Sequence, residues 1–161
     1  MKKTVTKVLC ILLCLLFVFP FAVSAEVEAK LPVTVNAKAA ILVDASTGQV
    51  LAAMNEHDRL YPASVTKIMT LLLVMEAIDS GRLNLTDEVV TSATAAAKGG
   101  SQIWLKEGET MTVDELLRAA AIYSANDACE ALGEHIAGSE EAFVGMMNEK
   151  ASELGMVDTH F

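Results

Sequence analysis

Two patterns of apolar residues divide the chain. Short apolar runs at 40–44 and 49–53 flank a polar turn at 45–48 that ends in glycine. Two such runs around a glycine-containing turn predict a β-hairpin. From residue 64 onward the apolar positions follow the helical repeat instead. The sequence therefore predicts a hairpin followed by a mostly helical block.

Four helices are predicted in that block. The first runs from Ser64 to the stop signal Ser80-Gly81 and is apolar almost all round, so we expect it to lie in the middle of the protein. The second opens at Thr112, where Thr112 and Glu115 form a capping-box pattern, and runs to about residue 123.

The third and fourth helices follow closely. The third is expected to start after Asn126 and to end at Gly138, and the fourth to run from Ser139 to Gly155, with one apolar face. Between the first two helices, residues 83–110 are irregular except for a short strand predicted at 88–91 and a loop at 98–101.

Residues 1–25 have the pattern of a secretory signal peptide. Three lysines precede an uncharged apolar run at 8–23, and Ser24-Ala25 provides the small residues that signal peptidase prefers. We expect cleavage after Ala25 and export to the cell envelope; a retained membrane anchor is the alternative. Residues 26–38 resemble an extended lead-in, and 39–161 form the domain.

Composition argues against several classes of function. After Ala25 the chain carries 9 basic against 21 acidic residues, so nucleic acid is not an expected partner. Cys129 is the one cysteine beyond the signal peptide and is interpreted as a small buried hydrophobe. No metal site and no cofactor are expected, because no other ligand type joins the three histidines at ligand spacing: His57, His135 and His160.

The candidate chemistry begins with Ser64-Val65-Thr66-Lys67. Residues three apart on a helix share a face, so the hydroxyl and the amine can meet. Pro62 places Ser64 near the first helical turn, where free backbone amides and the helix dipole favour developing negative charge. A neutral lysine amine in the same turn can accept the serine proton. The alternative is an ordinary helix cap beside a solvated lysine.

A second motif, Ser124-Ala125-Asn126, lies at the junction of two predicted helices. A hydroxyl projected from this turn could pass a proton between Lys67 and a leaving amine, and the Asn126 amide could hold a substrate carbonyl. Serine, asparagine and Asp127 are also natural residues at helix ends, so the junction needs no catalytic purpose to explain its composition.

These motifs resemble those of low-molecular-weight penicillin-binding proteins of the D-alanyl-D-alanine carboxypeptidase family. The resemblance covers residues 39–161. Its most specific segments are Tyr61 to Thr70, Gly99-Gly100-Ser101, Ser124 to Cys129, and Gly155 to Phe161. It implies an α/β (α+β) fold of the β-lactamase/transpeptidase type, of which this chain holds the N-terminal hairpin and the helical block.

The resemblance also implies a reaction and a role for each site residue. Ser64 would attack the carbonyl between the two terminal D-alanines of a peptidoglycan stem peptide, and β-lactam antibiotics would acylate the same serine. Lys67 would be the proton acceptor and Ser124 the proton relay. Asn126 would contact the substrate, with Gly100 and Ser101 at the border of the cleft.

The family's third motif, Lys-Thr-Gly, does not occur in these 161 residues. We therefore expect the fold to be incomplete, without the C-terminal strands and without the membrane anchor that relatives often carry after them. Two alternatives stay open at this point: a serine β-lactamase, whose class A form prefers Ser-Asp-Asn in the second motif, and a non-catalytic relic of the fold.

Overall fold

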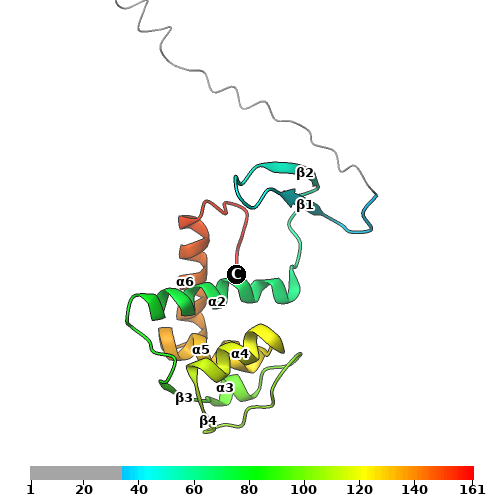
Figure 1. The fold of residues 1–161 in the computed structure, drawn as a ribbon. Helices are drawn as coiled ribbons and strands as arrows, with labels where there is room; N and C mark the ends of the chain where they lie inside the picture. Colours follow the sequence, from blue (N-terminus) through cyan, green and yellow to red (C-terminus); the bar gives the residue numbers. More distant parts are fainter. Residues whose placement is uncertain (1–33) are drawn as a thin grey trace, which may run out of the picture. The chain divides into compact units, whose positions relative to one another are not determined.

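The computed structural model describes residues 34–161 and divides the chain into two compact units, which meet between Asp58 and Arg59 (Figure 1). Each unit is described by itself. The predicted signal peptide and most of the lead-in lie outside the described residues. No helix within residues 34–161 is both long enough and apolar enough to cross a membrane.

The first unit contains the predicted hairpin. Strand β1 (Ala40–Val43) pairs antiparallel with β2 (Val50–Met54), in a register that joins Ala40 to Met54 and shifts between Leu42 and Val43. The prediction of two strands around a turn is confirmed, with bounds that differ by one residue at three of the four strand ends.

The hairpin turn is organised by one carboxylate. Asp44 Oδ1 accepts hydrogen bonds from the backbone amides of Ser46 and Thr47 at 3.0 and 2.9 Å, and from their hydroxyls at 2.6 and 2.8 Å. Gly48 closes the turn with a φ of +73°, a conformation that costs glycine little. The turn therefore depends on a charged aspartate rather than on packing.

This turn should respond to acid in a defined window. Hydrogen bonds from the Ser46 and Thr47 hydroxyls, and then from their amides, lower the pKa of Asp44 from 3.8 to about 2. Because the folded-state pKa is the lower one, the stabilisation is present above pH 3.8 and is lost as the pH falls through 2. An NMR titration of the Asp44 carboxyl should therefore have its midpoint near pH 2. A midpoint near 3.8 would show that the hydrogen bonds of the turn do not stabilise the charged carboxylate.

The second unit is helical. The short 3-10 helix η1 (Ala63–Thr66) leads directly into α2 (Lys67–Asp79). The remaining helices are α3 (Ala93–Ala96), α4 (Val113–Ile122), α5 (Asn126–Ala137) and α6 (Glu140–Glu153). The four long helices were all predicted. The capping box of α4 is present, since Thr112 and Glu115 each bond to the other's backbone amide.

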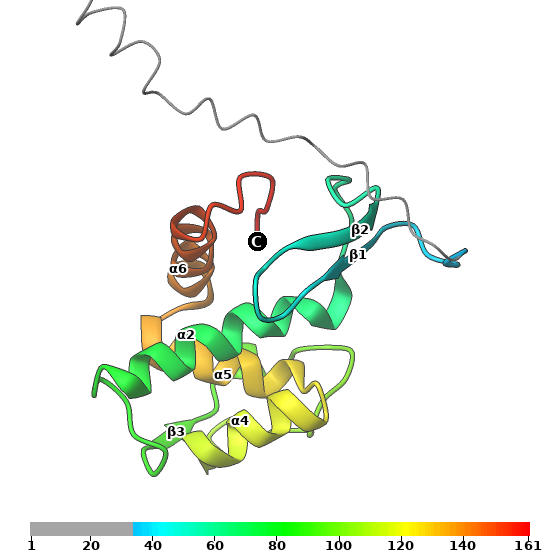
Figure 2. The same ribbon diagram turned by 45° about the horizontal axis from the view of Figure 1, so that its top comes forward.

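Helix α5 lies at the centre of this unit. It packs against α2, α3, α4 and α6, and Figure 2 shows α2 and α4 running on either side of it. The main core forms between these helices and is made of small and branched apolar side chains, including Val74, Val113, Leu116, Ala128 and Leu132. A smaller core joins α2 to α6 through Leu73, Phe143 and Met147. The start of α5 is therefore held firmly by its neighbours.

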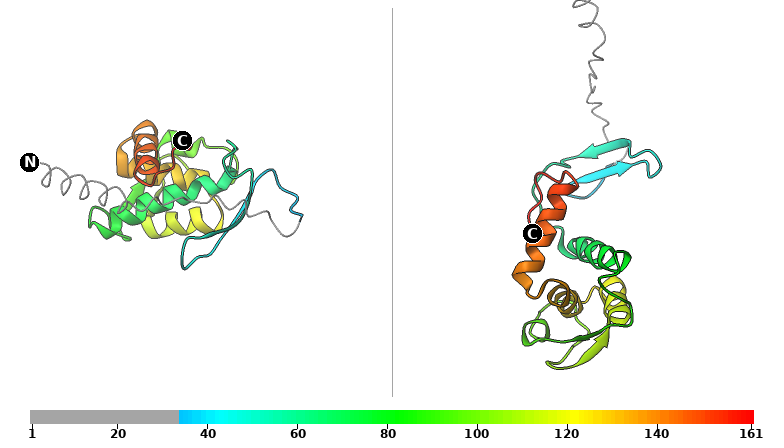
Figure 3. Two further views of the ribbon diagram at one scale, coloured as in Figure 1. Left: turned by 90° about the horizontal axis from the view of Figure 1, so that it is seen from above. Right: turned by 90° about the vertical axis from the view of Figure 1, so that its left-hand side faces the viewer.

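Two short elements were not foreseen. These are strand β4 (Thr110–Thr112) and the single-turn helix α3. Strand β4 pairs antiparallel with β3 (Glu88–Val90), which was predicted. Figure 3 shows the β3–β4 ribbon on the far side of α4 and α5 from α2. A strand of three residues is too short to show an alternating pattern, and a single helical turn is too short to show a helical repeat.

Helix α2 is less enclosed than its sequence suggests. One side is buried through Met69, Leu73 and Val74, but Ile68 and Met75 are 66% and 45% exposed. In α6 the predicted face Phe143, Met147 and Ala151 is buried, whereas Leu154 is exposed. The helical unit covers only one side of α2.

Candidate active site

Ser64 lies in η1, one turn before the body of α2. Its neighbour Ala63 has a φ of +50°, a left-handed conformation that L-residues adopt only at a cost of about 1–3 kcal/mol. Lys67 is the first residue of α2 and half-buried, and its Nζ lies 3.4 Å from Ser64 Oγ. The predicted serine–lysine pair is therefore formed on one face of a continuous helical segment.

Ser124 is the second neighbour of Ser64. It lies in the junction between α4 and α5 with a φ of +57°. Its Oγ donates a hydrogen bond to Ser64 Oγ at 2.7 Å. Strained backbone at active sites commonly aims a side chain that a relaxed turn would direct elsewhere. Here Ser64 follows the left-handed residue Ala63, and Ser124 itself has a left-handed backbone.

Asn126, the first residue of α5, uses both ends of its side-chain amide. Its Oδ1 accepts a hydrogen bond from Lys67 Nζ at 2.6 Å, and its Nδ2 donates to the carbonyl of Gly99 at 2.7 Å. The backbone amide of Asn126 donates to the carbonyl of Ser101, also at 2.7 Å. Asn126 therefore joins Lys67 to the loop at 98–101, a contact that the sequence did not indicate.

Gly100 approaches Asn126 so closely that a side chain would not fit. Its φ is +82°, and a Cβ built at this position would lie 2.7 Å from Asn126 Nδ2. Ser101, on the next position of the loop, is held through its carbonyl. The structure thus brings all six predicted site residues together: Ser64, Lys67, Gly100, Ser101, Ser124 and Asn126.

Asp127 is a supporting residue that sequence reasoning treated only as a helix-end residue. Its side chain is fully buried, and its two oxygens accept hydrogen bonds from the backbone amides of Ile103, Leu105 and Ala128 at 3.0–3.2 Å. The carboxylate therefore fastens the loop after Ser101 to the start of α5. The only sequence feature that could have indicated this supporting role is the presence of an aspartate directly after Ser124-Ala125-Asn126.

The arrangement can move protons around one hydroxyl. Ser64 Oγ is exposed and has an amine and a second hydroxyl as neighbours, and a hydroxyl can both donate and accept. Cys129 offers no competing nucleophile, because burial raises the pKa of its thiol to about 11. Among residues 34–161, no three His, Cys, Asp or Glu side chains gather where they could hold a metal ion.

Comparison with known proteins gives the family of this chain. The family model for D-alanyl-D-alanine carboxypeptidase, peptidase family S11, matches residues 24–161. The D-alanyl-D-alanine carboxypeptidase DacF of Bacillus subtilis is 55% identical over 126 residues, which are 78% of this chain and 32% of DacF. The family match thus covers every residue of the candidate site.

Solved structures share the fold. Penicillin-binding protein 6B of Escherichia coli superposes with a TM-score of 0.76 at 43% identity, over 83% of this chain and 44% of that one. Penicillin-binding protein D2 of Listeria monocytogenes, solved in an ampicillin-bound form, gives a TM-score of 0.68 at 28% identity, over 78% and 50% of the two chains.

The fold is therefore that of the penicillin-binding proteins, as predicted, and the described residues form part of it. The chain spans about a third of the length of the curated relatives it matches. By sequence, the chain belongs to the D-alanyl-D-alanine carboxypeptidase family, peptidase family S11.

Proposed function

We propose that these residues form the nucleophile-bearing part of a serine-type D-Ala-D-Ala carboxypeptidase. The observation that carries the proposal is the environment of Ser64 Oγ, which has Lys67 Nζ at 3.4 Å and Ser124 Oγ at 2.7 Å. A weakly acidic hydroxyl needs a neighbouring base to become a nucleophile, and both neighbours can take part in removing its proton.

The proposed reaction has two steps. Ser64 Oγ bonds to the carbonyl carbon of the penultimate D-alanine while its proton passes to the Lys67 amine, and the bond to the terminal D-alanine breaks. Ser124 relays a proton to the departing amine. Water then attacks the ester, which releases the shortened peptide and restores the Ser64 hydroxyl. Asn126, Gly100 and Ser101 border the site where the peptide lies.

The backbone amide of Ser64 would stabilise the oxyanion. Family resemblance calls for a second amide, from a strand that carries Lys-Thr-Gly, and that motif does not occur in these 161 residues. Oxyanion donors contribute strongly to such reactions, with one donor worth about 100- to 1,000-fold in rate. The proposal therefore concerns the complete protein that carries these residues.

The proposed substrate is the stem peptide of peptidoglycan, and β-lactams are the proposed acylating inhibitors. The ampicillin-bound relative supports the second point. Both ligands call for an extracytoplasmic location, which the signal-like residues 1–25 would provide.

Release of D-alanine tests the proposal directly. The complete protein is incubated with a peptide ending in D-Ala-D-Ala, beside Ser64→Ala and the control Ser152→Ala, which changes an exposed serine on α6. We expect wild type and the control to release D-alanine and Ser64→Ala to release none above background. Equal release by Ser64→Ala would overturn the assignment of the nucleophile.

Adjacent glycines allow a second prediction. Gly100→Ala should slow the reaction at least about tenfold, because a Cβ there would displace the Asn126 amide, and small misplacements cost large factors in rate. Gly99→Ala is the neighbouring control, since nothing lies within 4 Å of its Cβ position; the φ of +82° at Gly100 adds backbone strain to the effect of the Gly100 Cβ. Rates are measured by D-alanine release, and similar rates for the two variants would contradict the role given to Gly100.

A further inference from the structure

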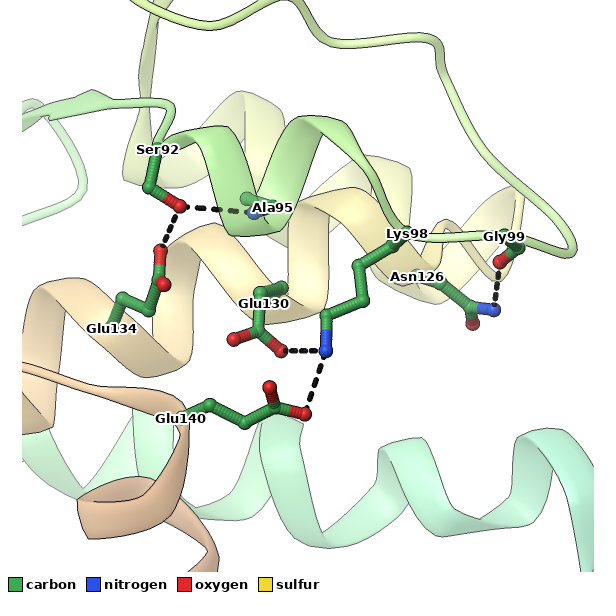
Figure 4. Close-up of polar contacts among 8 residues, drawn as sticks. All are labelled: Ser92, Ala95, Lys98, Gly99, Asn126, Glu130, Glu134 and Glu140. Carbon is green, nitrogen blue, oxygen red and sulfur yellow. Dashed lines mark hydrogen bonds and ion pairs between the residues drawn. The ribbon is translucent and has the colours of Figure 1, made fainter.

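The loop that borders the site is attached to α5 and α6 by an ion cluster. Lys98 follows α3 after one residue, and its Nζ lies 3.0 Å from Glu130 Oε2 and 2.6 Å from Glu140 Oε1 (Figure 4). Glu130 belongs to α5, and Glu140 is the first residue of α6. One lysine thus connects three helices at the point where the loop begins.

Lys98 and Gly99 bind α5 at two places one helical turn apart. The Lys98 side chain pairs with Glu130, while the carbonyl of Gly99 accepts from Asn126 Nδ2 at 2.7 Å (Figure 4). Residues four apart on a helix share one face. The loop is therefore fixed both in its distance from α5 and in its position along it.

The second of these contacts determines how the Asn126 amide is oriented. With Nδ2 held by the Gly99 carbonyl, Oδ1 turns toward Lys67 Nζ and accepts its hydrogen bond at 2.6 Å. A loop that shifted along α5 would release Nδ2, and the amide could then rotate away from Lys67. The position of Lys98 therefore affects the Lys67 amine through two hydrogen bonds, from Asn126 Nδ2 to the Gly99 carbonyl and from Lys67 Nζ to Asn126 Oδ1.

The cluster is poorly suited to a purely stabilising role. Glu130 is 10% exposed, and its Oε1 is buried without a hydrogen-bond partner among the described residues. Burial raises the pKa of Glu130, against the lowering effect of Lys98. Buried ion pairs often add no net stability compared with apolar residues of similar size. In this structure the pairs join the start of the loop to α5 and α6.

We propose that Lys98 is a positioning residue: through Glu130 and Glu140 it holds the Gly99 carbonyl where it orients the Asn126 amide toward Lys67. The consequence for reaction rate rests on the proposed function. The consequence for loop geometry does not.

A second lysine provides a matched control. Lys150 bridges Glu76 and Glu153 at 3.0 and 2.6 Å, the same two distances, and its side chain is 18% exposed, compared with 26% for Lys98. It joins α6 to α2, and both of its ion-pair partners lie outside the loop at 98–101. Lys98→Met and Lys150→Met therefore each remove two ion pairs, from different places. The acids differ in burial, because Glu130 is 10% exposed and Glu76 and Glu153 are 42% and 65% exposed.

The complete protein and both variants are compared by two measurements. The first is the second-order rate constant for acylation by a fluorescent penicillin. We expect Lys98→Met to lower it about 10- to 100-fold, and Lys150→Met to leave it within about twofold. The second is hydrogen exchange of the Asn126 backbone amide, which bonds to Ser101. It should be about tenfold faster in Lys98→Met alone.

The two measurements separate the two proposals. If wild type is not acylated, the proposed function fails, and hydrogen exchange alone decides the positioning role. If Lys98→Met matches Lys150→Met in exchange and in any acylation observed, the positioning role is wrong. Should Lys98→Met not fold, Glu140→Gln weakens the same cluster at its more exposed end and is expected to change both measurements in the same direction.

Discussion

Replacing Lys67 with methionine is expected to slow acylation of Ser64 by penicillin by about 100- to 10,000-fold, the usual contribution of a positioned base. Methionine keeps the approximate length of the side chain and removes the amine. The amine is the only basic group recorded beside Ser64 Oγ among the described residues, at 3.4 Å, and it also anchors Asn126 Oδ1. Both contacts are lost together.

The measurement is the acylation rate in the complete protein, with Lys106→Met as control. Lys106 is exposed and lies in the loop before β4, so its loss should change the rate by less than about twofold. A Lys67→Met protein that acylates at the wild-type rate would show that another group accepts the proton, with Ser124 as the next candidate.

Replacing Asp127 with alanine is expected to lower the free energy of unfolding by about 3 kcal/mol. The change leaves the half-buried amide of Ile103 and the buried amide of Leu105 without their acceptor, and an unsatisfied buried group costs about 1–3 kcal/mol. Asp127→Asn keeps one acceptor oxygen and should fall between wild type and alanine. Chemical denaturation of the complete protein measures all three.

Asp114 is the matched control for this prediction. It is the second residue of α4, as Asp127 is of α5, so both carboxylates lie at the positive end of a helix. Asp114 pairs with Arg118 at the surface, and Asp114→Ala should cost no more than about 1 kcal/mol. Equal losses for the two alanine variants would mean that the buried bonds of Asp127 add nothing.

The larger elements of the fold could be predicted from sequence because their signals are local. The hairpin follows from two short apolar runs and Gly48, and α4 from the capping box at Thr112. The fold class and the family followed from motif resemblance, and the comparisons agree with both. β4 was not predicted because its pairing with β3 determines it, and α3 was not predicted because a single turn shows no helical repeat.

The residues of the site could be predicted from the sequence, but the hydrogen bonds and backbone conformations that join them could not. The spacing of Ser64 and Lys67 on one helix shows that they can meet. No sequence pattern shows that Ser124 adopts a left-handed backbone, or that the Gly99 carbonyl lies against Asn126. These features depend on how α4, α5 and the loop pack together, and packing between distant segments leaves no periodic signal.

The central claim is that Ser64 is the nucleophile of a penicillin-reactive carboxypeptidase. Mass spectrometry of the complete protein after exposure to penicillin tests it most directly. The account predicts a mass increase of one penicillin per chain, located by peptide mapping on Ser64 and missing from Ser64→Ala. An adduct on another residue, or an equal adduct on Ser64→Ala, would contradict it.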